Sequence, residues 1–592
     1  MARSKVFRAV RRWLRLARDT EQNLDPVAAE KAREWALSRR SFFLGTMGTA
    51  ALLPLVSACG DNTKPDEPGP GIAIIGGGIA GMTAAHFLRL GGVQAQVFEA
   101  SMRIGGRTYT DRETYSDDGQ IVELGGELVD SDHLTMQALA AHFGIVLDDL
   151  PDATAGLDQD LFYFTNGPFP NPSASIKRTE DELINLFRPV ALKMQTALMK
   201  TEGTDDASVA EFNRIDAMSI PAWLNDEANL APSDLIRRLL EVSYIEEFGL
   251  EVEQQSAWNL ITLIDATPQL TVANGGYFHV FGDSDERYHL HTGSQSIAEH
   301  MAAQLTEQIN LDHALSKVAK NGDLFDLTFT TSGGDIVVTA SHVIYALPFT
   351  KLREVDLTAA ELSDDKMTVI KELGYGTNAK LMMQFEDRHW ETLGSAGSVI
   401  GDVGDSPDLS GLGTGLQTVW STSRGQDGDP GILTNFVGGQ RGVDIASGTP
   451  ESQAMTVLPW LEKIWPGIAA KYVAGSAIRQ HWPTYEFNKG SYASYLIGQW
   501  SFFGTEGLRE GNQHFCGEHT SGDFQGYMEG GAGTGAAAAA EVLDDLEFEY
   551  PYTLKQILDM LAELRPVPST AKAVLRRSAA AARAAKRQRR AG

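Results

Sequence analysis

The clearest pattern of hydrophobic and polar positions begins near residue 71, where three short periodic segments follow one another. Residues 72–75 are continuously apolar and are followed by glycine, which is typical of a short buried strand. Residues 79–90 carry apolar side chains at helical spacing, and residues 94–98 predict a second strand. Together these segments predict one βαβ unit, in which a helix joins two parallel strands.

The later parts of the chain alternate between helical and strand patterns. From about residue 131 to 260 the spacing is mostly helical, and Asp130 or Ser131 is the expected cap of the first helix. Residues 324–348 predict strands around a Gly-Gly turn. Residues 516–545, rich in glycine and alanine, predict a strand end followed by a helix. No repeat of fixed period is present.

The turn between the first strand and the first helix has the sequence GGGIAG, which fits G-x-G-x-x-G. Gly76 permits the tight turn, Gly78 lets a pyrophosphate approach the backbone, and Gly81 lets helix and strand pack closely. The anion binds free N–H groups at the helix N-terminus, where Ala80 lies. Glu99 ends the second strand, where a carboxylate accepts hydrogen bonds from a ribose. These parts predict a bound dinucleotide rather than a purely structural loop.

The charge of the chain is unevenly distributed along its length. Residues 1–59 carry +6 and residues 566–592 carry +8, so the total of −28 leaves −42 on the segment between them. A body this acidic argues against a nucleic-acid partner and mildly favours cationic small molecules. The alternative is that the acidic surface serves solubility alone.

The first 70 residues look like an export signal and a tether. Residues 38–44, SRRSFFL, resemble the twin-arginine signal, and VSAC, which ends at Cys59, resembles a lipoprotein processing box. A plain cleaved signal or an uncleaved anchor are the alternatives to lipidation of Cys59. Residues 60–70 are polar and proline-rich, as in a tether. We expect an exported protein, periplasmic or held at the membrane only through the signal or the lipidated cysteine.

Three further segments resemble signatures of the flavin-dependent monoamine oxidase and L-amino-acid oxidase family. They are ASMRIGGRTYT after Glu99, ELGGELVD at residues 123–130, and FCGEHTSGDFQGYMEGGAGTGAAAAAEV at residues 515–542. They occur in the family's order, and the resemblance spans roughly residues 71 to 545. It implies that the dinucleotide is FAD, because NAD enzymes have no second glycine-arginine element.

The resemblance also assigns residues to the cofactor. Arg103 and Arg107 belong to the element whose arginine steadies the pyrophosphate, and Gly106 lets backbone lie against the cofactor. Gly126 belongs to the glycine pair that passes near the flavin ring.

The closing segment adds further cofactor contacts by the same resemblance. Glu518 is expected to hold a ribitol hydroxyl, while Met528 and Glu529 would offer backbone N–H groups to the O2/N1 side of the flavin. Val318 in SKVAK matches the family's adenine-side valine.

The resemblance places three side chains at the reacting face of the flavin. YGTNAKLMMQFEDRHW resembles the strand whose lysine, here Lys380, holds a water near flavin N5. A lysine in an apolar strand is costly to bury without a task, and the alternative is an edge-strand lysine that reaches solvent. Tyr492 and Tyr527 match the family's aromatic cage, with packing as the alternative role. Ser491 stands where some relatives attach FAD through cysteine, so we expect non-covalent FAD.

The implied reaction is hydride transfer from the carbon of a neutral amine to flavin N5. An imine forms and hydrolyses to a carbonyl compound, and O2 takes the electrons to give peroxide. An L-amino-acid oxidase is the second hypothesis, although no carboxylate-binding arginine stands near Glu127. Glu127 or Asp130 could instead attract a cationic amine, or serve as a structural acid beside the flavin. A lipid desaturase or isomerase and a non-catalytic surface flavoprotein are the remaining hypotheses. No metal site is predicted, and the oligomeric state is left open.

The predicted fold class is α/β, with a Rossmann-like FAD-binding domain of the GR2 type and an inserted α+β substrate-binding domain. Twin-arginine export carries folded proteins, so such a domain would take up FAD in the cytoplasm. The predicted segments are the signal (1–59), the tether (60–70), the three parts of the FAD-binding domain (71–130, 286–349 and 501–545), the two parts of the substrate domain (131–285 and 350–500) and a C-terminal helix with a basic tail (546–592).

Overall fold

The computed structural model describes most of the chain between residues 71 and 547. The predicted signal, Cys59, the tether and all but two residues of the predicted C-terminal helix and basic tail (546–592) lie outside the described residues. The described ranges are 71–116, 119–157, 161–164, 180–201, 205–232, 234–263, 285–403 and 416–547. Within them, no helix is both long enough and apolar enough to span a membrane.

An eight-stranded sheet carries the predicted βαβ unit. Its order is β13-β10-β11-β12-β1-β2-β9, and β19 pairs with β12. β1 runs parallel to both β2 and β12, which confirms the predicted crossover. The strands are β1 (Gly71–Ile75), β2 (Ala95–Phe98), β9 (Ile309–Asn310), β10 (Ala314–Asn321), β11 (Leu324–Thr331), β12 (Gly334–Tyr345), β13 (Asp356–Ala359) and β19 (Gln513–Phe515). β13 belongs to this sheet although it lies beyond the expected boundary at residue 349.

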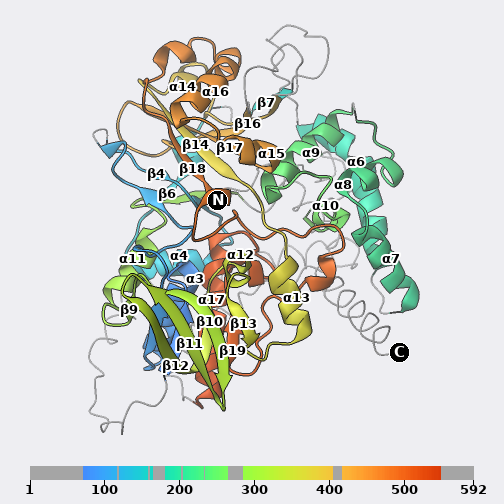
Figure 1. Cartoon of the computed structure of the whole chain (residues 1–592). Helices are drawn as coiled ribbons and strands as arrows, with labels where there is room; N and C mark the ends of the chain where they lie inside the picture. The colour runs from blue at the N-terminus through green and yellow to red at the C-terminus, as the bar shows by residue number, and fades with distance from the viewer. Residues whose placement is uncertain are drawn as a thin grey trace, which may run out of the picture.

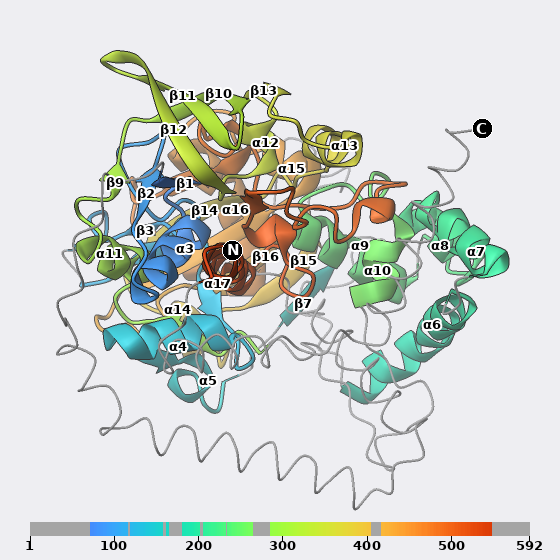
Figure 2. The ribbon, with the colours of Figure 1, turned by 90° about the horizontal axis from the view of Figure 1, so that it is seen from below.

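Two helices that are far apart in the sequence pack side by side against this sheet. α3 (Ile79–Leu90) and α17 (Met528–Asp545) lie together near the centre of Figure 2. A Cβ at Gly535 would stand 2.2 Å from the carbonyl oxygen of Ala80, so the small residues of α17 permit this close approach. The helix predicted within residues 516–545 is present as α17, and Gly535 serves its packing.

The first helix after the βαβ unit is capped by a distant side chain. α4 (Leu134–Phe143) has no side-chain bond from its own N-cap residue, so the expected cap at Asp130 or Ser131 is wrong. Instead, the Glu529 carboxylate accepts hydrogen bonds from the N–H groups of Thr135 and Met136, both at 2.9 Å. The start of α17 therefore fixes the start of α4.

A second, six-stranded sheet stands above the first in Figure 1. Its order is β18-β14-β17-β16-β15-β7. Its strands are β7 (Leu161–Phe164), β14 (Ala379–Phe385), β15 (Val399–Val403), β16 (Leu416–Ser421), β17 (Gly431–Val437) and β18 (Ile478–His481). Helices gather at its side, as predicted for residues 131–260: α6 (Glu180–Lys200), α7 (Asp206–Asp216), α8 (Ile220–Asp226), α9 (Leu235–Phe248) and α10 (Ala257–Leu263).

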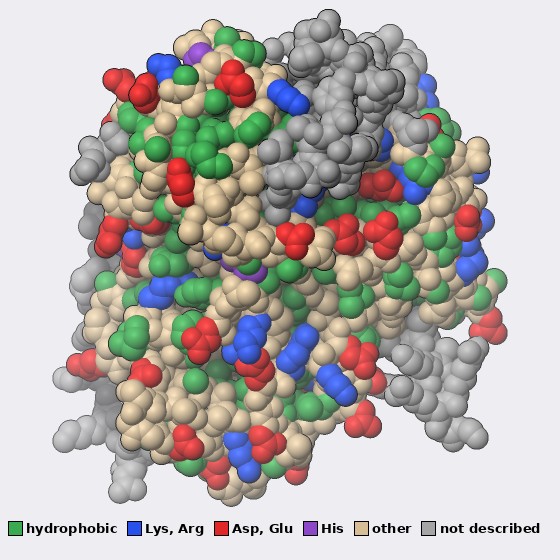
Figure 3. Space-filling model, turned by 45° about the horizontal axis from the view of Figure 1, so that its top comes forward, with side chains coloured by type: hydrophobic (Ala, Val, Ile, Leu, Met, Phe, Trp, Pro, Cys, Tyr) green, Lys and Arg blue, Asp and Glu red, His purple; other side chains and the backbone are tan. Residues whose placement is uncertain are grey.

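Smaller elements join the two sheets. β3 (Thr110–Asp111) pairs with β4 (Val122–Glu123), and β8 (Tyr288–Leu290) lies between β5 (Leu128–Val129) and β6 (Leu147–Asp149). The remaining helices are α5 (Leu150–Ala153), α11 (Ser296–Ala303), α12 (Phe349–Leu352), α13 (Asp364–Glu372), α14 (His389–Thr392), α15 (Gly439–Asp444) and α16 (Pro450–Ile464). On the face drawn in Figure 3, acidic side chains are scattered among basic ones.

Candidate active site

A single cavity brings together residues from both ends of the described chain. It encloses about 310 Å³ beside the carboxyl ends of β1 and β2. Most residues predicted to bind the cofactor line it: Gly76, Gly78, Ala80, Glu99, Arg103, Gly106, Arg107, Gly126, Glu518 and Met528. Tyr527 lines it too, whereas Gly81, Val318, Lys380 and Tyr492 do not.

The turn after β1 has the conformation that its glycines were expected to allow. Gly76 has φ +109°, and a Cβ there would lie 2.7 Å from the carbonyl oxygen of Ala346. A Cβ at Gly81 would lie only 2.0 Å from the carbonyl oxygen of Gly76. Gly81 therefore sets the contact between strand and helix and does not need to touch a ligand.

Two helix N-termini open into the cavity. Neither α3 nor α17 has a side-chain bond from its N-cap residue, and the first turn of α3 contains no acidic side chain. The starts of both helices line the cavity. Free N–H groups at a helix N-terminus favour anionic or electron-rich ligand atoms, so the cavity fits a pyrophosphate at one end and a polar ring at the other.

Glu99 stands at the end of β2, where a ribose acceptor was expected. One of its carboxylate oxygens accepts from the N–H of Gly77 at 2.7 Å, and the other accepts from the N–H and Oγ of Ser101, at 2.9 and 2.7 Å. These bonds hold the carboxylate at the cavity wall, and a carboxylate has further lone pairs for a ligand hydroxyl.

The two arginines of the second signature are held by the protein. Arg103 donates to the carbonyl oxygens of Ile104 and Gly106, at 3.1 and 2.6 Å, and thereby shapes its own loop. Arg107 forms an ion pair with Glu518 at 2.7 Å, although the two are 411 residues apart. This pair joins the second and the last cofactor signatures at one wall of the cavity.

The assignment of Val318 to the cofactor is corrected by the structure. Its side chain is fully buried in the hydrophobic core beside Leu327, away from the cavity. Leu315 and Ser316 of the same strand line the cavity instead. Leu315 pairs with Phe329 and Val318 with Leu327, so an irregular register between Leu315 and Lys317 puts both side chains on one face of β10. They differ in their position along the strand.

Lys380 is fully buried on a central strand. β14 lies between β17 and β18, so the alternative of an edge-strand lysine reaching solvent is wrong. The Lys380 ammonium donates to Glu127 Oε2 at 2.8 Å. It also donates to the carbonyl oxygens of Glu123 and Gly125, at 2.9 and 2.8 Å. An ammonium has three N–H groups, so a water held by Lys380 would have to share or replace one of these bonds.

Glu127 is a structural acid that completes this arrangement. Its Oε1 accepts from the indole N–H of Trp420 at 2.9 Å, while its Oε2 pairs with Lys380. Burial alone would raise the pKa of Glu127, but the Lys380 ammonium and the hydrogen bonds hold that pKa below its usual value. The carboxylate is therefore ionised and already paired, which removes it as an attractor of a cationic substrate.

One face of the six-stranded sheet carries Lys380 together with polar and aromatic neighbours. Phe436 stands opposite both Lys380 and Thr418 in the strand register, so the three side chains share that face. The buried Glu246 of α9 accepts a hydrogen bond from Thr418 through its carboxylate and one from the Tyr492 hydroxyl through its carbonyl oxygen.

The two predicted aromatic walls occupy different surroundings. Tyr527 is the N-cap residue of α17 and lines the cavity. Tyr492 is fully buried and donates to the carbonyl oxygen of Glu246 at 3.1 Å. Its role as a second wall stays a prediction. The preceding Ser491 donates its hydroxyl hydrogen to Asn378 at 2.6 Å.

Sequence reasoning missed one buried imidazole in the cavity wall. His519 is 1% exposed and lines the cavity, and neither of its ring nitrogens has a hydrogen-bond partner among the described residues. Burial and the nearby Arg107 and Lys366 cations hold the pKa of His519 well below its usual value, so the ring is neutral. Its place directly after Glu518 in the closing signature was the available signal. An unpartnered polar group in the wall indicates a ligand with hydrogen-bonding atoms.

Comparisons with known proteins agree with this geometry. The family model described as flavin containing amine oxidoreductase matches residues 79–543. A flavin-containing amine oxidase of Danio rerio is 24% identical over 488 residues, which cover 80% of this chain and 85% of the relative. A pseudooxynicotine dehydrogenase of Pseudomonas sp is 24% identical over 529 residues, which cover 86% and 96%. The solved structure of putrescine oxidase bound to putrescine matches with a TM-score of 0.63 and 20% identity, covering 80% of this chain and 99% of that one. At this identity, the structural likeness confirms the predicted fold class.

Proposed function

The chain belongs to the flavin-containing amine oxidoreductase family and is an FAD-dependent enzyme of that family, and we propose that it oxidises a small amine at the carbon beside its nitrogen. The product would be an imine that water hydrolyses to a carbonyl compound and ammonia or a smaller amine. O2 would accept the electrons and become H2O2.

The observation that carries this proposal is the buried contact between Lys380 and the glycine pair at 125–126. The Lys380 ammonium donates to the Gly125 carbonyl oxygen, and the next residue, Gly126, lines the cofactor cavity. A buried cation is costly unless it is paired, and Glu127 supplies the pair. An ammonium group is therefore fixed directly behind the loop expected to pass the flavin ring.

The cofactor would be held by groups already in place around the cavity. Glu99 would bind the ribose, the start of α3 the pyrophosphate, and the start of α17 the electron-rich edge of the ring. Bound FAD would supply a two-electron acceptor for the hydride of the substrate carbon, and the electron acceptor would regenerate it. Ser491 has no thiolate chemistry and its hydroxyl is bonded to Asn378, so we expect the flavin to be held without a covalent bond.

The residues of this chain would orient and desolvate the substrate. Tyr527 offers one flat wall at the cavity, and the sheet face with Phe436 and Thr418 lies on the Lys380 side. The buried carboxylate of Glu246, bonded to Thr418, favours an approaching ammonium over a free carboxylate. The amine would lose its proton before the hydride leaves, because only the neutral nitrogen stabilises the developing imine.

The proposed electron acceptor is O2. One relative is named an amine oxidase and another a dehydrogenase, at the same 24% identity.

Export would place the enzyme where O2 is available, and the residues 38–44 and Cys59 support a twin-arginine signal with a lipidated terminus. We propose a periplasmic or membrane-anchored location. Fractionation of cells that express the native gene tests it, and an exclusively cytoplasmic protein would contradict it.

An amine panel tests the proposed activity. The FAD-loaded protein is mixed with primary amines, diamines and the corresponding amino acids, first without oxygen to follow flavin bleaching and then in air to follow peroxide. Bleaching by amines and peroxide in air are expected. Bleaching only by amino acids would select the L-amino-acid oxidase hypothesis, and bleaching without peroxide would indicate another acceptor. A lack of bleaching by any substrate would contradict the proposal.

A further inference from the structure

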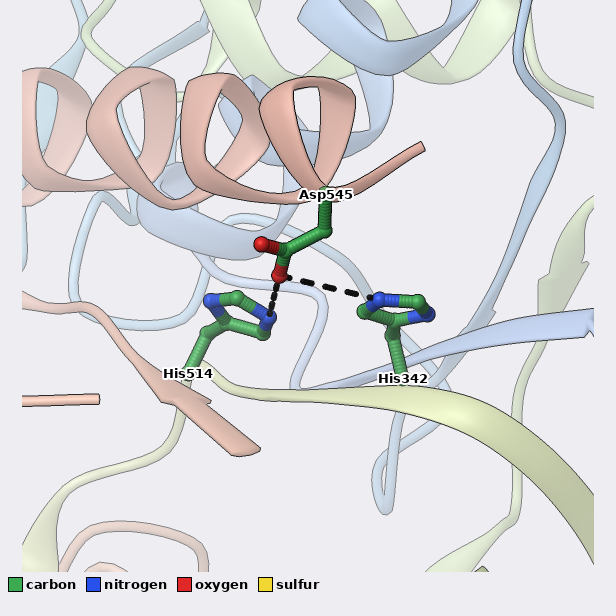
Figure 4. A group of neighbouring side chains, drawn as sticks. All are labelled: His342, His514 and Asp545. Atoms are coloured by element: carbon green, nitrogen blue, oxygen red, sulfur yellow. Dashed lines mark ion pairs between the residues drawn. The ribbon is translucent and has the colours of Figure 1, made fainter. Parts of the chain in front are cut away.

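Away from the cofactor cavity, two imidazoles and a carboxylate converge at the C-terminal end of α17. His342 stands on β12 and His514 on the neighbouring parallel strand β19, and their rings stack with centroids 5.9 Å apart. Asp545 is the last residue of α17. In Figure 4 both rings direct a nitrogen toward the same carboxylate oxygen. None of the three residues lines the cofactor cavity.

The distances leave a space that a metal ion would fill. His342 Nε2 and His514 Nε2 each lie 3.8 Å from Asp545 Oδ2. That separation is too long for a hydrogen bond. A tetrahedral ion with bonds of ~2.1 Å holds its ligand atoms about 3.4 Å apart, so a small contraction would complete the site.

Both nitrogens also lack any other partner. His342 is 6% exposed and His514 is fully buried, and neither Nε2 atom has a hydrogen-bond partner among the described residues. A buried polar atom without a partner destabilises the folded protein. Two such atoms directed at one oxygen therefore indicate an occupant that accepts electron pairs from both rings.

The opposite ring nitrogens are already fixed, as metal-bound histidines require. His514 Nδ1 lies 2.8 Å from Glu541 Oε2, and His342 Nδ1 lies 3.1 Å from Ser341 Oγ. Such outer contacts orient an imidazole and select the tautomer whose Nε2 is free to bind a metal.

Among the described residues, the Arg509 guanidinium is the cation that pairs with this cluster. It lies 3.0 Å from Asp545 Oδ1 and 2.9 Å from Asp545 Oδ2. An ion bound at Oδ2 would leave Oδ1 to this arginine. The Asp545 side chain is 23% exposed, so water can reach a fourth coordination position.

We propose that His342, His514 and Asp545 bind one divalent transition-metal ion, and that Zn²⁺ is the ion this donor set suits. Two imidazole nitrogens, one carboxylate oxygen and a water match the ligands and number of a zinc site. The ion would join β12, β19 and the end of α17. Because β19 leads to Glu518 and α17 begins at Met528, it would stabilise the segment that closes the cofactor cavity.

Zinc titration of the FAD-loaded protein tests the proposal. The holoprotein is dialysed against a chelator and titrated with Zn²⁺ by calorimetry, and Co²⁺ is used as a visible probe of coordination. We expect one Zn²⁺ per chain, a Kd of about 1 µM or tighter, a rise of Tm with zinc and the absorption bands of a four-coordinate cobalt site. His342→Gln should abolish the stoichiometric zinc binding, the rise of Tm with zinc and the cobalt bands.

Matched variants separate this site from unspecific binding. His300→Gln removes an exposed histidine of α11 outside the cluster and should bind zinc like the parent protein. Asp545→Asn leaves both rings in place and should weaken zinc binding at least ~10-fold. If His342→Gln misfolds and loses its FAD, Asp545→Asn replaces it as the test variant. Absence of stoichiometric zinc in the parent protein, or unchanged zinc affinity in FAD-loaded His342→Gln and Asp545→Asn, would overturn the proposal.

Discussion

Replacing Lys380 with methionine removes a buried cation while leaving its partner behind. The substitution deletes the ion pair with Glu127 and two bonds to backbone oxygens of the glycine loop. Glu127 would then be a carboxyl group with 3% of its side chain exposed and no Lys380 ammonium to compensate its charge. Breaking such a pair from one side costs ~3–5 kcal/mol. The unfolding entropy is ~2.1 cal/mol/K per residue, which gives about 1 kcal/mol/K for the region that the family model matches. Dividing the lost free energy by this entropy predicts that Tm falls by roughly 3–5 °C.

The double variant Lys380→Met with Glu127→Gln separates charge from packing. Because it removes the unpaired carboxylate as well, it should recover most of the lost Tm, and the two substitutions should be strongly non-additive. Thermal unfolding followed by the release of flavin fluorescence measures both variants. Equal losses of Tm in the single and double variants would refute the inferred coupling.

Kinetics of the same two variants test whether Lys380 acts in the reaction. Anaerobic flavin reduction by a substrate amine and reoxidation by O2 are followed separately by stopped flow. We expect at least one of the two rates to fall ~10-fold or more in both variants, which corresponds to about 1.4 kcal/mol in the barrier. Unchanged rates in the thermally restored double variant would limit Lys380 to a structural role.

Three further outcomes follow from individual contacts. Arg107→Met leaves Glu518 unpaired at the cavity wall and should raise the FAD Kd ~10–100-fold, whereas Arg112→Met, from a half-exposed ion pair, should leave it unchanged; flavin fluorescence titration measures both. Burial raises the pKa of Asp216 to about 6, so its contribution to stability is present below the unfolded pKa and is lost as pH rises through about 6. The stability of Asp216→Asn relative to the parent protein, measured by Tm, should therefore rise between about pH 4 and about pH 7, by an amount equivalent to ~3 kcal/mol. A difference in Tm between the two proteins that does not change with pH would contradict it. Acid denaturation should release all flavin from the parent protein because Ser491 cannot tether it, and flavin that stays with the polypeptide would disprove this expectation.

Local patterns were sufficient for the nucleotide-binding part of the fold. The helix predicted over 79–90 has those bounds, and the glycine turn before it has the geometry that its spacing required. These features depend on neighbouring residues, whose hydrophobic period and conformational freedom are visible in the sequence.

Long-range pairing was not visible in the same way. Glu529 caps α4, which begins almost 400 residues earlier in the chain. Neither the sequence around α4 nor the sequence around Glu529 reveals this pairing. The sequence leaves open whether Glu127 attracts the substrate, and its bond to Lys380 is visible only in the structure. On β10, Leu315 lines the cofactor cavity and Val318 does not, although an irregular register puts both on one face of the strand. Such features arise only when distant segments meet.

The most direct test of the account is the optical spectrum of the purified full chain before and after an amine is added without oxygen. The account predicts a yellow protein that carries one FAD per chain and loses the absorption of oxidised flavin when a suitable amine is mixed in. A colourless protein that takes up no FAD, or a flavin that no amine or amino acid reduces, would contradict it.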